Sequence, residues 1–118
     1  MFMDSILTSI KKLLGIDEFY THFDEDIILH INTAFMILHQ LGVGPSEGFY
    51  ISDKTTKWFE FFGAKKNFEA IKTYVYLKVR IIFDPPQVGY LVDALNAQIT
   101  EYEWRINAQA EGEIINGW

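Results

Sequence analysis

The sequence predicts an all-α fold, a small bundle of four main helices with a long loop between the second and the third. Apolar residues recur at helical spacing in four stretches of the chain, and glycines or prolines stand between these stretches. No linker or internal repeat divides the 118 residues, of which 49% are hydrophobic. A single domain over 1–118 with a modest core is therefore expected.

The first helix is expected over 4–14, where apolar residues form one stripe. Asp4 or Ser5 can cap its start, and Gly15 can end it in a left-handed conformation. This helix should therefore bury one face and expose the other.

The second helix is expected over 24–41. Asp24 is a favourable N-cap residue, and Gly42 suits a left-handed end. Apolar residues lie on more than one face of this helix, which indicates more than one packing partner.

The segment that follows breaks the helical pattern. Residues 43–56 are rich in glycine and contain a proline, and the extended run 49–51 allows a short hairpin arm. The aromatic stretch 57–62 suits one or two helical turns. A long loop with a hairpin or a helical turn is therefore expected between the second and third main helices.

The third main helix is expected over 67–83, and Pro85 and Pro86 prevent its continuation. Apolar residues cover two stripes of this helix, one of which can face the core. A small domain has too little core to bury a helix on all sides. The second stripe is therefore expected to face a neighbouring copy of the chain, and it consists of Tyr74, Leu77 and Ile81.

The fourth main helix is expected over 88–108, where apolar residues alternate at spacings of four and three. Such a stripe suits antiparallel packing on the third helix. Trp104 lies off the stripe and should face elsewhere. Residues 109–118 contain two glycines and no helical pattern, so an extended carboxyl-terminal tail is expected.

Charge and composition exclude several classes of function. The 10 basic residues are outnumbered by 16 acidic ones, and the net charge of −6 argues against a general nucleic-acid binder. Basic residues interleaved with tyrosines around the third helix keep nucleic-acid binding open, but salt bridges, including some to a neighbouring copy, are favoured. There is no cysteine, which excludes disulfides and thiolate sites. No run approaches the ~18 apolar residues that a membrane helix needs.

No catalytic, cofactor or metal site is expected, so the chain is not expected to be an enzyme. His22, His30 and His39 are eight and nine residues apart, whereas two ligands on one helical face need a spacing of three or four. The glycines over 42–48 are not followed by the lysine and hydroxyl residue of a phosphate-binding loop. Structural roles explain all of these residues more simply.

The three tryptophans are the strongest candidates for protein contacts, because tryptophan is enriched at interface hot spots. Trp104 and Trp118 favour an interface. Trp58, beside Phe59, suits a core or an interface equally well.

Several motifs together resemble a known family. They are His-Phe-Asp at 22–24, Gln-Leu-Gly-Val-Gly at 40–44, Tyr-Val-Tyr-Leu-Lys-Val-Arg at 74–80, Phe-Asp-Pro-Pro at 83–86 and Glu-Trp-Arg-Ile-Asn at 103–107. In these motifs the chain resembles the small helical head–tail connector, or adaptor, proteins of tailed bacteriophages and prophages. The resemblance covers about 3–110, and its motifs are structural rather than catalytic.

The resemblance implies a structural virion protein in the neck, made in the cytoplasm of the host bacterium. It implies a ring, expected to be twelvefold, that docks on the portal, extends the DNA channel and offers a platform for a stopper or tail-completion protein. Double-stranded DNA would pass through the lumen without sequence-specific binding, and no cofactor or membrane would be involved.

Two sets of residues are expected to make these contacts. The set expected between subunits consists of Trp58, Phe59, Tyr74, Leu77, Ile81, Trp104 and Arg105. The set expected to dock on the portal or on a neighbour consists of Ile114, Ile115 and Trp118. The alternative function is a small oligomeric helical regulatory or protein-binding module in the bacterial cytoplasm.

Overall fold

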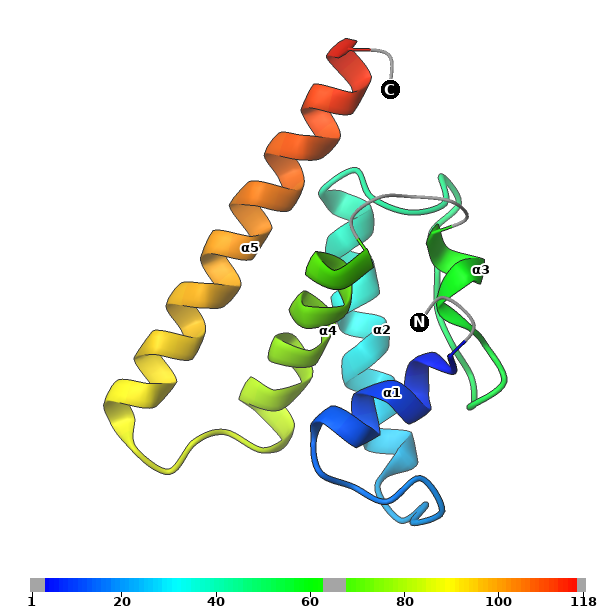
Figure 1. The fold of residues 1–118 in the computed structure, drawn as a ribbon, viewed down its shortest axis with the longest axis vertical. Coiled ribbons are helices and arrows are strands. Elements are labelled where there is room, and N and C mark those ends of the chain that lie inside the picture. The colour runs from blue at the N-terminus through cyan, green and yellow to red at the C-terminus, as the bar shows by residue number, and fades with distance from the viewer. Residues whose placement is uncertain (1–3, 63–67, 117–118) are drawn as a thin grey trace.

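The computed structural model describes residues 4–62 and 68–116, with side chains described over 4–61 and 68–111. Over these ranges the secondary structure is helical, without a strand, which confirms the all-α fold. The helices in Figure 1 are α1 (Ile6–Leu13), α2 (Asp24–Gln40), α3 (Trp58–Phe62), α4 (Phe68–Phe83) and α5 (Gly89–Asn116).

The centre of the fold is formed by α2, α4 and α5. Helix α4 packs on α2 along one side and on α5 along another, while α1 crosses both α2 and α4 (Figure 1). The core-forming side chains of the three central helices include Ile31, Phe35, Val75, Val79, Leu95 and Ile99. The predicted hairpin between α4 and α5 is confirmed, with the two prolines in its corner.

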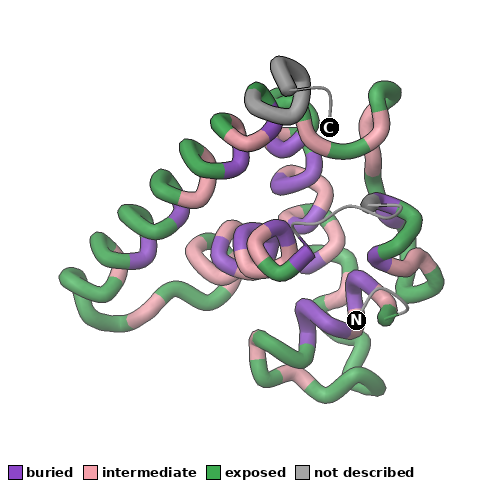
Figure 2. Tube along the Cα trace, turned by 45° about the horizontal axis from the view of Figure 1, so that its top comes forward, coloured by how far each residue is buried: buried purple, intermediate pink, exposed green. Residues whose placement is uncertain are grey.

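Helix α5 is buried on one side only. Figure 2 shows its buried positions on the side that faces α4 and its exposed positions on the other side. Leu95, Ile99 and Ile106 are buried on the inner side, as their spacing predicts. The outer side therefore has no partner within the described chain.

The start of α2 differs from the prediction. Asp24 is the first residue of the helix rather than its N-cap, and no side chain caps the helix at Phe23. The Asp24 carboxylate instead lies 2.9 Å from the ammonium group of Lys11. Ion pairing with a buried lysine therefore replaces capping as the role of this carboxylate.

A loop of residues 41–57 covers one end of α2, and it does not form the hairpin arm that the sequence allowed. The side-chain amide of Asn32 donates to the carbonyl of Ile51 at 2.9 Å and accepts from its N–H at 2.7 Å. These two bonds satisfy the extended backbone in place of a second strand. The predicted helical turn is present as α3.

The aromatic side chains of this region join the core. Trp58 is fully buried and donates from Nε1 to Oγ of Ser9 at 2.7 Å. Phe61 packs against Phe35, with ring centroids 4.8 Å apart. Gly44 has a φ of +94° beside this cluster, and a Cβ there would lie 2.5 Å from the Phe61 ring. The loop conformation therefore requires glycine at this position.

The expectation of an extended tail over 109–118 is wrong for residues 109–116, because α5 continues to Asn116. A glycine inside a helix costs only about 1 kcal/mol relative to alanine, and tertiary contacts offset that cost here. Asn107 donates to the carbonyl of Leu41, and Ala110 lies against Gly42, so the far half of α5 is held to the end of α2. Residues 117–118 lie outside the described residues.

Candidate functional site: protein–protein surfaces

The described side chains offer no metal centre. They contain no group of three or more histidine, cysteine, aspartate or glutamate residues that could hold an ion. Among the helices of residues 4–62 and 68–116, none has both the length and the hydropathy to cross a membrane.

Two of the residues expected between subunits belong to the core of the monomer. Tyr74 and Leu77 are buried, and the Tyr74 hydroxyl donates to Oε2 of Glu103 on α5 at 2.7 Å. Burial, together with this bond and the negative charge of Glu103, raises the pKa of Tyr74 well above its usual range. Helix α5 thus covers a stripe that was expected to remain free, and only the half-buried Ile81 keeps an accessible part.

Trp58 is likewise a core residue, which corrects its expected place between subunits. Its indole fills the space between α1 and α2, where the N–H bond to Ser9 satisfies its polar atom. The adjacent Phe59 remains 42% exposed and stays available for contacts.

The structure places Trp104 on the outer side of α5, where 70% of its surface is exposed. Arg105 lies beside it and pairs with Glu101 one turn away, at 3.1 Å between Nη2 and Oε1. An exposed tryptophan with an ion pair alongside is a combination typical of protein interfaces.

The three residues expected to dock on the portal are placed only in part. Ile114 and Ile115 fall in the last turns of α5, for which the backbone alone is described. Trp118 lies outside the described residues.

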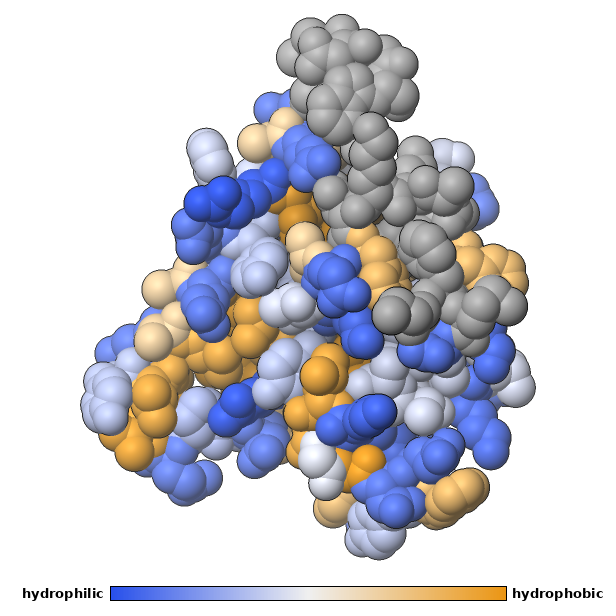
Figure 3. All heavy atoms as spheres, in the orientation of Figure 1, coloured by the Kyte–Doolittle hydropathy of each residue, from blue (hydrophilic) through white to orange (hydrophobic). Residues whose placement is uncertain are grey.

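Exposed apolar side chains also gather where α5 begins. Figure 3 shows apolar surface at the lower left, at this end of the helix. Val88, Tyr90 and Leu91 are exposed here, as is Ile82 at the end of α4. Helical periodicity did not predict that these residues are exposed. Their exposure depends on the direction in which α5 leaves the corner after α4, and spacing along the chain does not determine that direction.

A second exposed element is the loop between α1 and α2. Lys11 is buried, and its ammonium group donates to the carbonyls of Glu18 and Tyr20 at 3.0 and 2.7 Å. These bonds hold the loop in place, and Phe19 beside it is 81% exposed. The sequence pattern did not predict that Lys11 is buried, because a lysine near the carboxyl end of an amphipathic helix is ordinarily exposed.

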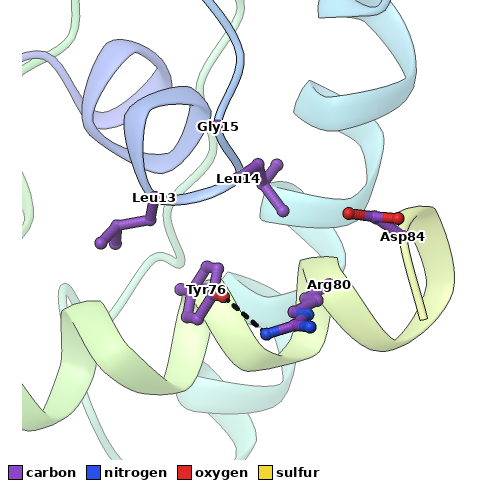
Figure 4. A pocket seen from close by; sticks show the side chains of 6 residues that line it. All are labelled: Leu13, Leu14, Gly15, Tyr76, Arg80 and Asp84. Carbon is purple, nitrogen blue, oxygen red and sulfur yellow. Dashed lines mark hydrogen bonds between the residues drawn. The ribbon is translucent and has the colours of Figure 1, made fainter. Parts of the chain in front are cut away.

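Between α1 and α4 lies a hollow of about 250 Å³ that sequence reasoning also missed. Figure 4 shows Leu13 and Leu14 on one side and Tyr76, Arg80 and Asp84 on the other. Arg80 donates from Nη1 to the Tyr76 hydroxyl at 3.1 Å. Only the approach of two helices that are distant in sequence creates this hollow.

Charge is distributed unevenly over the helices. Among the described side chains, α5 carries four acidic residues and one basic, whereas α4 carries three basic residues and one acidic. The two helices therefore differ in the sign of their charge, which favours contact between unlike surfaces.

A family model described as "Phage connector protein" matches residues 6–113. No curated protein and no solved structure matches the chain significantly.

Proposed function

The chain belongs to the phage connector protein family, and from this membership we propose that it forms a ring that docks on the portal and joins the phage head to the tail. Membership itself makes it a structural phage protein of the head–tail connection, as the resemblance in its motifs indicated. The ring, expected to be twelvefold, and its docking on the portal are the proposal. A stopper or tail-completion protein would bind the opposite side of the ring.

The observation that carries the proposal is the exposed outer side of α5. Over the described side chains, up to residue 111, α5 is buried on one side only and exposes a tryptophan on the other, which is a surface suited to a partner. The exposed residues Phe59 and Arg105 belong to the proposed subunit contacts, and Ile81 contributes what remains accessible of its side chain.

The acidic composition supports passage of DNA through the ring. A net charge of −6 repels phosphate, so a lumen formed by such chains would let double-stranded DNA slide without holding it. Sequence-specific contacts are not part of the proposal.

Imaging of assembled particles tests the ring directly. Antibody labelling of the protein in negative-stain images should place a ring at the head–tail junction, and the protein should co-purify with virions. Particles whose necks lack the protein would overturn the proposal and favour a cytoplasmic regulatory module.

Deletion of residues 111–118 tests the proposed docking of the carboxyl-terminal segment through Ile114, Ile115 and Trp118. The deletion retains Ile106 and Ala110, the last buried side chains of α5 among those described, so the monomer should stay folded while portal binding weakens. Glu111→Gln is the matched control, because it changes one exposed side chain and keeps the segment. Normal infectious particles from the deletion would refute this docking.

A further inference from the structure

We infer that the outer side of α5 docks into the hollow between α1 and α4 of a second copy of the chain, with Trp104 entering the hollow. The inference rests on the proposed ring and names the two surfaces that would form each subunit contact. The proposed contact joins two different surfaces of the same molecule.

Trp104, the side chain that would enter the hollow, lies between two charged residues of α5. Trp104 is exposed, and Glu101 and Arg105 flank it on the same side of the helix. Both charged side chains are more than half exposed, so they can exchange their mutual ion pair for partners on another chain. Tryptophan provides the large apolar contact that an interface anchor needs.

The hollow has the size and the chemistry to receive an indole ring. Its volume of about 250 Å³ suits one large side chain, and Leu13 and Leu14 provide an apolar wall. Across from them, Arg80 offers a planar cation on which an indole can stack, and Asp84 offers an acceptor for the indole N–H (Figure 4). Among the side chains that the structure describes, neither Arg80 nor Asp84 takes part in an ion pair.

The order of the charges fixes how the two helices would lie. At the end of α4, Arg80 is followed four residues later by Asp84, which is the first residue beyond the helix and whose N–H bonds to the Arg80 carbonyl. Along α5 the order is reversed, Glu101 and then Arg105. Opposite charges therefore meet in both pairs only when α5 of one copy runs parallel to α4 of the next. An antiparallel arrangement would bring Glu101 to Asp84, which like-charge repulsion disfavours.

A contact between two different surfaces has a consequence for symmetry. Each copy offers one Trp104 and one hollow, so every copy can bind two neighbours. Such heterologous contacts generate a ring when the rotation closes. A symmetric pairing of α5 with α5 would stop at a dimer.

Cross-linking between single-cysteine variants tests the geometry, because the chain contains no cysteine of its own. In the parallel alignment, Ala94 of α5 lies opposite Thr73 on α4 of the neighbour, one heptad before Glu101 and Arg80. Ala94 is exposed and Thr73 is half-buried. Ala94→Cys mixed with Thr73→Cys should give a dimer with a short bis-maleimide, while neither variant should cross-link with itself. Ala94→Cys mixed with Ser52→Cys, an exposed position in the loop 41–57, is the control.

Two outcomes of the cross-linking would overturn the inference. One is that Ala94→Cys cross-links fastest with itself, which indicates a symmetric contact. The other is that the pair with Thr73→Cys reacts no faster than the control pair with Ser52→Cys.

Association measured by sedimentation tests the energetics. Trp104→Ala should weaken self-association about 30-fold, the effect of a typical interface hot spot. Tyr50→Ala removes an equally exposed aromatic side chain from the loop 41–57, outside both proposed surfaces, and should change association less than about threefold. Equal effects of the two substitutions would contradict the inference, and circular dichroism checks that both variants stay folded.

A charge exchange completes the test. Arg80→Glu and Glu101→Arg should each weaken association, and their combination in one chain should restore it, because the pair is re-formed with the charges reversed. A combined variant that is weaker than both single variants would count against the contact.

The failure of this inference is distinguishable from failure of the proposed function. Rings at the neck without the 94–73 cross-link would reject the contact and leave the connector ring standing. A protein that neither self-associates, nor binds portals, nor occurs in virions would reject both.

Discussion

Replacing Lys11 by methionine should destabilise the protein by about 2–3 kcal/mol. The Lys11 side chain is only 2% exposed, and it donates to the carbonyls of Glu18 and Tyr20. Its ammonium group also lies 2.9 Å from Oδ1 of Asp24. That oxygen is buried and makes no hydrogen bond within the described structure, so Lys11 supplies its compensating charge.

The magnitude follows from how far water can replace the lost ammonium group. Removing one partner of a fully buried ion pair costs about 3–5 kcal/mol. Asp24 is 24% exposed, and Glu18 and Tyr20 lie in an exposed loop, so partial hydration lowers the cost to about 2–3 kcal/mol. Methionine keeps the length of the apolar stem, so packing should change little.

Urea denaturation followed by circular dichroism measures this loss, with Lys12→Met as the control. Lys12 is the next residue on the same helix and is exposed, so its replacement should change stability by less than about 0.5 kcal/mol. Thermal unfolding should show a decrease of roughly 10 °C in Tm for Lys11→Met. A loss no larger than that of Lys12→Met would refute the assigned role of the buried ammonium group.

The Tyr74 hydroxyl and the backbone at Gly44 each make a measurable contribution to stability. The raised pKa of Tyr74 means that the folded state holds this proton more tightly than the unfolded chain, so stability should fall as pH rises above about 10, by up to about 1.4 kcal/mol per pH unit. Tyr74→Phe removes the titrating hydroxyl and its bond to Glu103. The free energy of unfolding of this variant, measured by urea denaturation from pH 9 to 11.5, should therefore decline less steeply with pH than that of the wild type. Equal slopes for the two proteins would contradict the prediction. Gly44→Ala should cost about 2–4 kcal/mol, because alanine is strained at φ +94° and its Cβ would overlap the Phe61 ring. Gly48→Ala has a similar φ but open space, so denaturation should show only about 1–2 kcal/mol; equal losses would mean that the Phe61 ring moves aside freely.

The sequence predicted the elements of this fold better than their contacts. Helical spacing located the main helices, and the two prolines marked the corner before α5. Gly42 ends α2 with a φ of +88°, as a left-handed cap requires. These features depend on a few neighbouring residues, so a single sequence is sufficient to predict them.

Which faces of the helices remain exposed was harder to predict. Periodicity shows that Tyr74 and Leu77 share a stripe of α4, but it does not show which helix covers that stripe. Helix α5 covers it through contacts such as the bond from Tyr74 to Glu103. The prediction that Trp104 lies off the core-facing stripe of α5 is confirmed. It succeeded because α5 packs on the rest of the fold through a single stripe, and helical spacing is sufficient to locate a single stripe.

Two further features, the carboxyl-terminal end of α5 and the hollow, depend on contacts between residues distant in sequence, and sequence patterns did not predict them. The glycine at position 112 suggested an extended tail, yet the contact of Ala110 with Gly42 supports a continuous helix. The hollow depends on the crossing of α1 over α4, and no spacing along the chain encodes that crossing.

The bond between Ser9 and Trp58 has a consequence for how the protein folds during translation. The two residues are separated by 49 positions, and the backbone of Asp4 and Ile6 also bonds to residues near Trp58. At about 5–20 residues per second, a ribosome needs roughly 2–10 s to synthesise that interval. Helix α1 is therefore made first, but its bonds to residues 56–58 can form only after that interval has been synthesised.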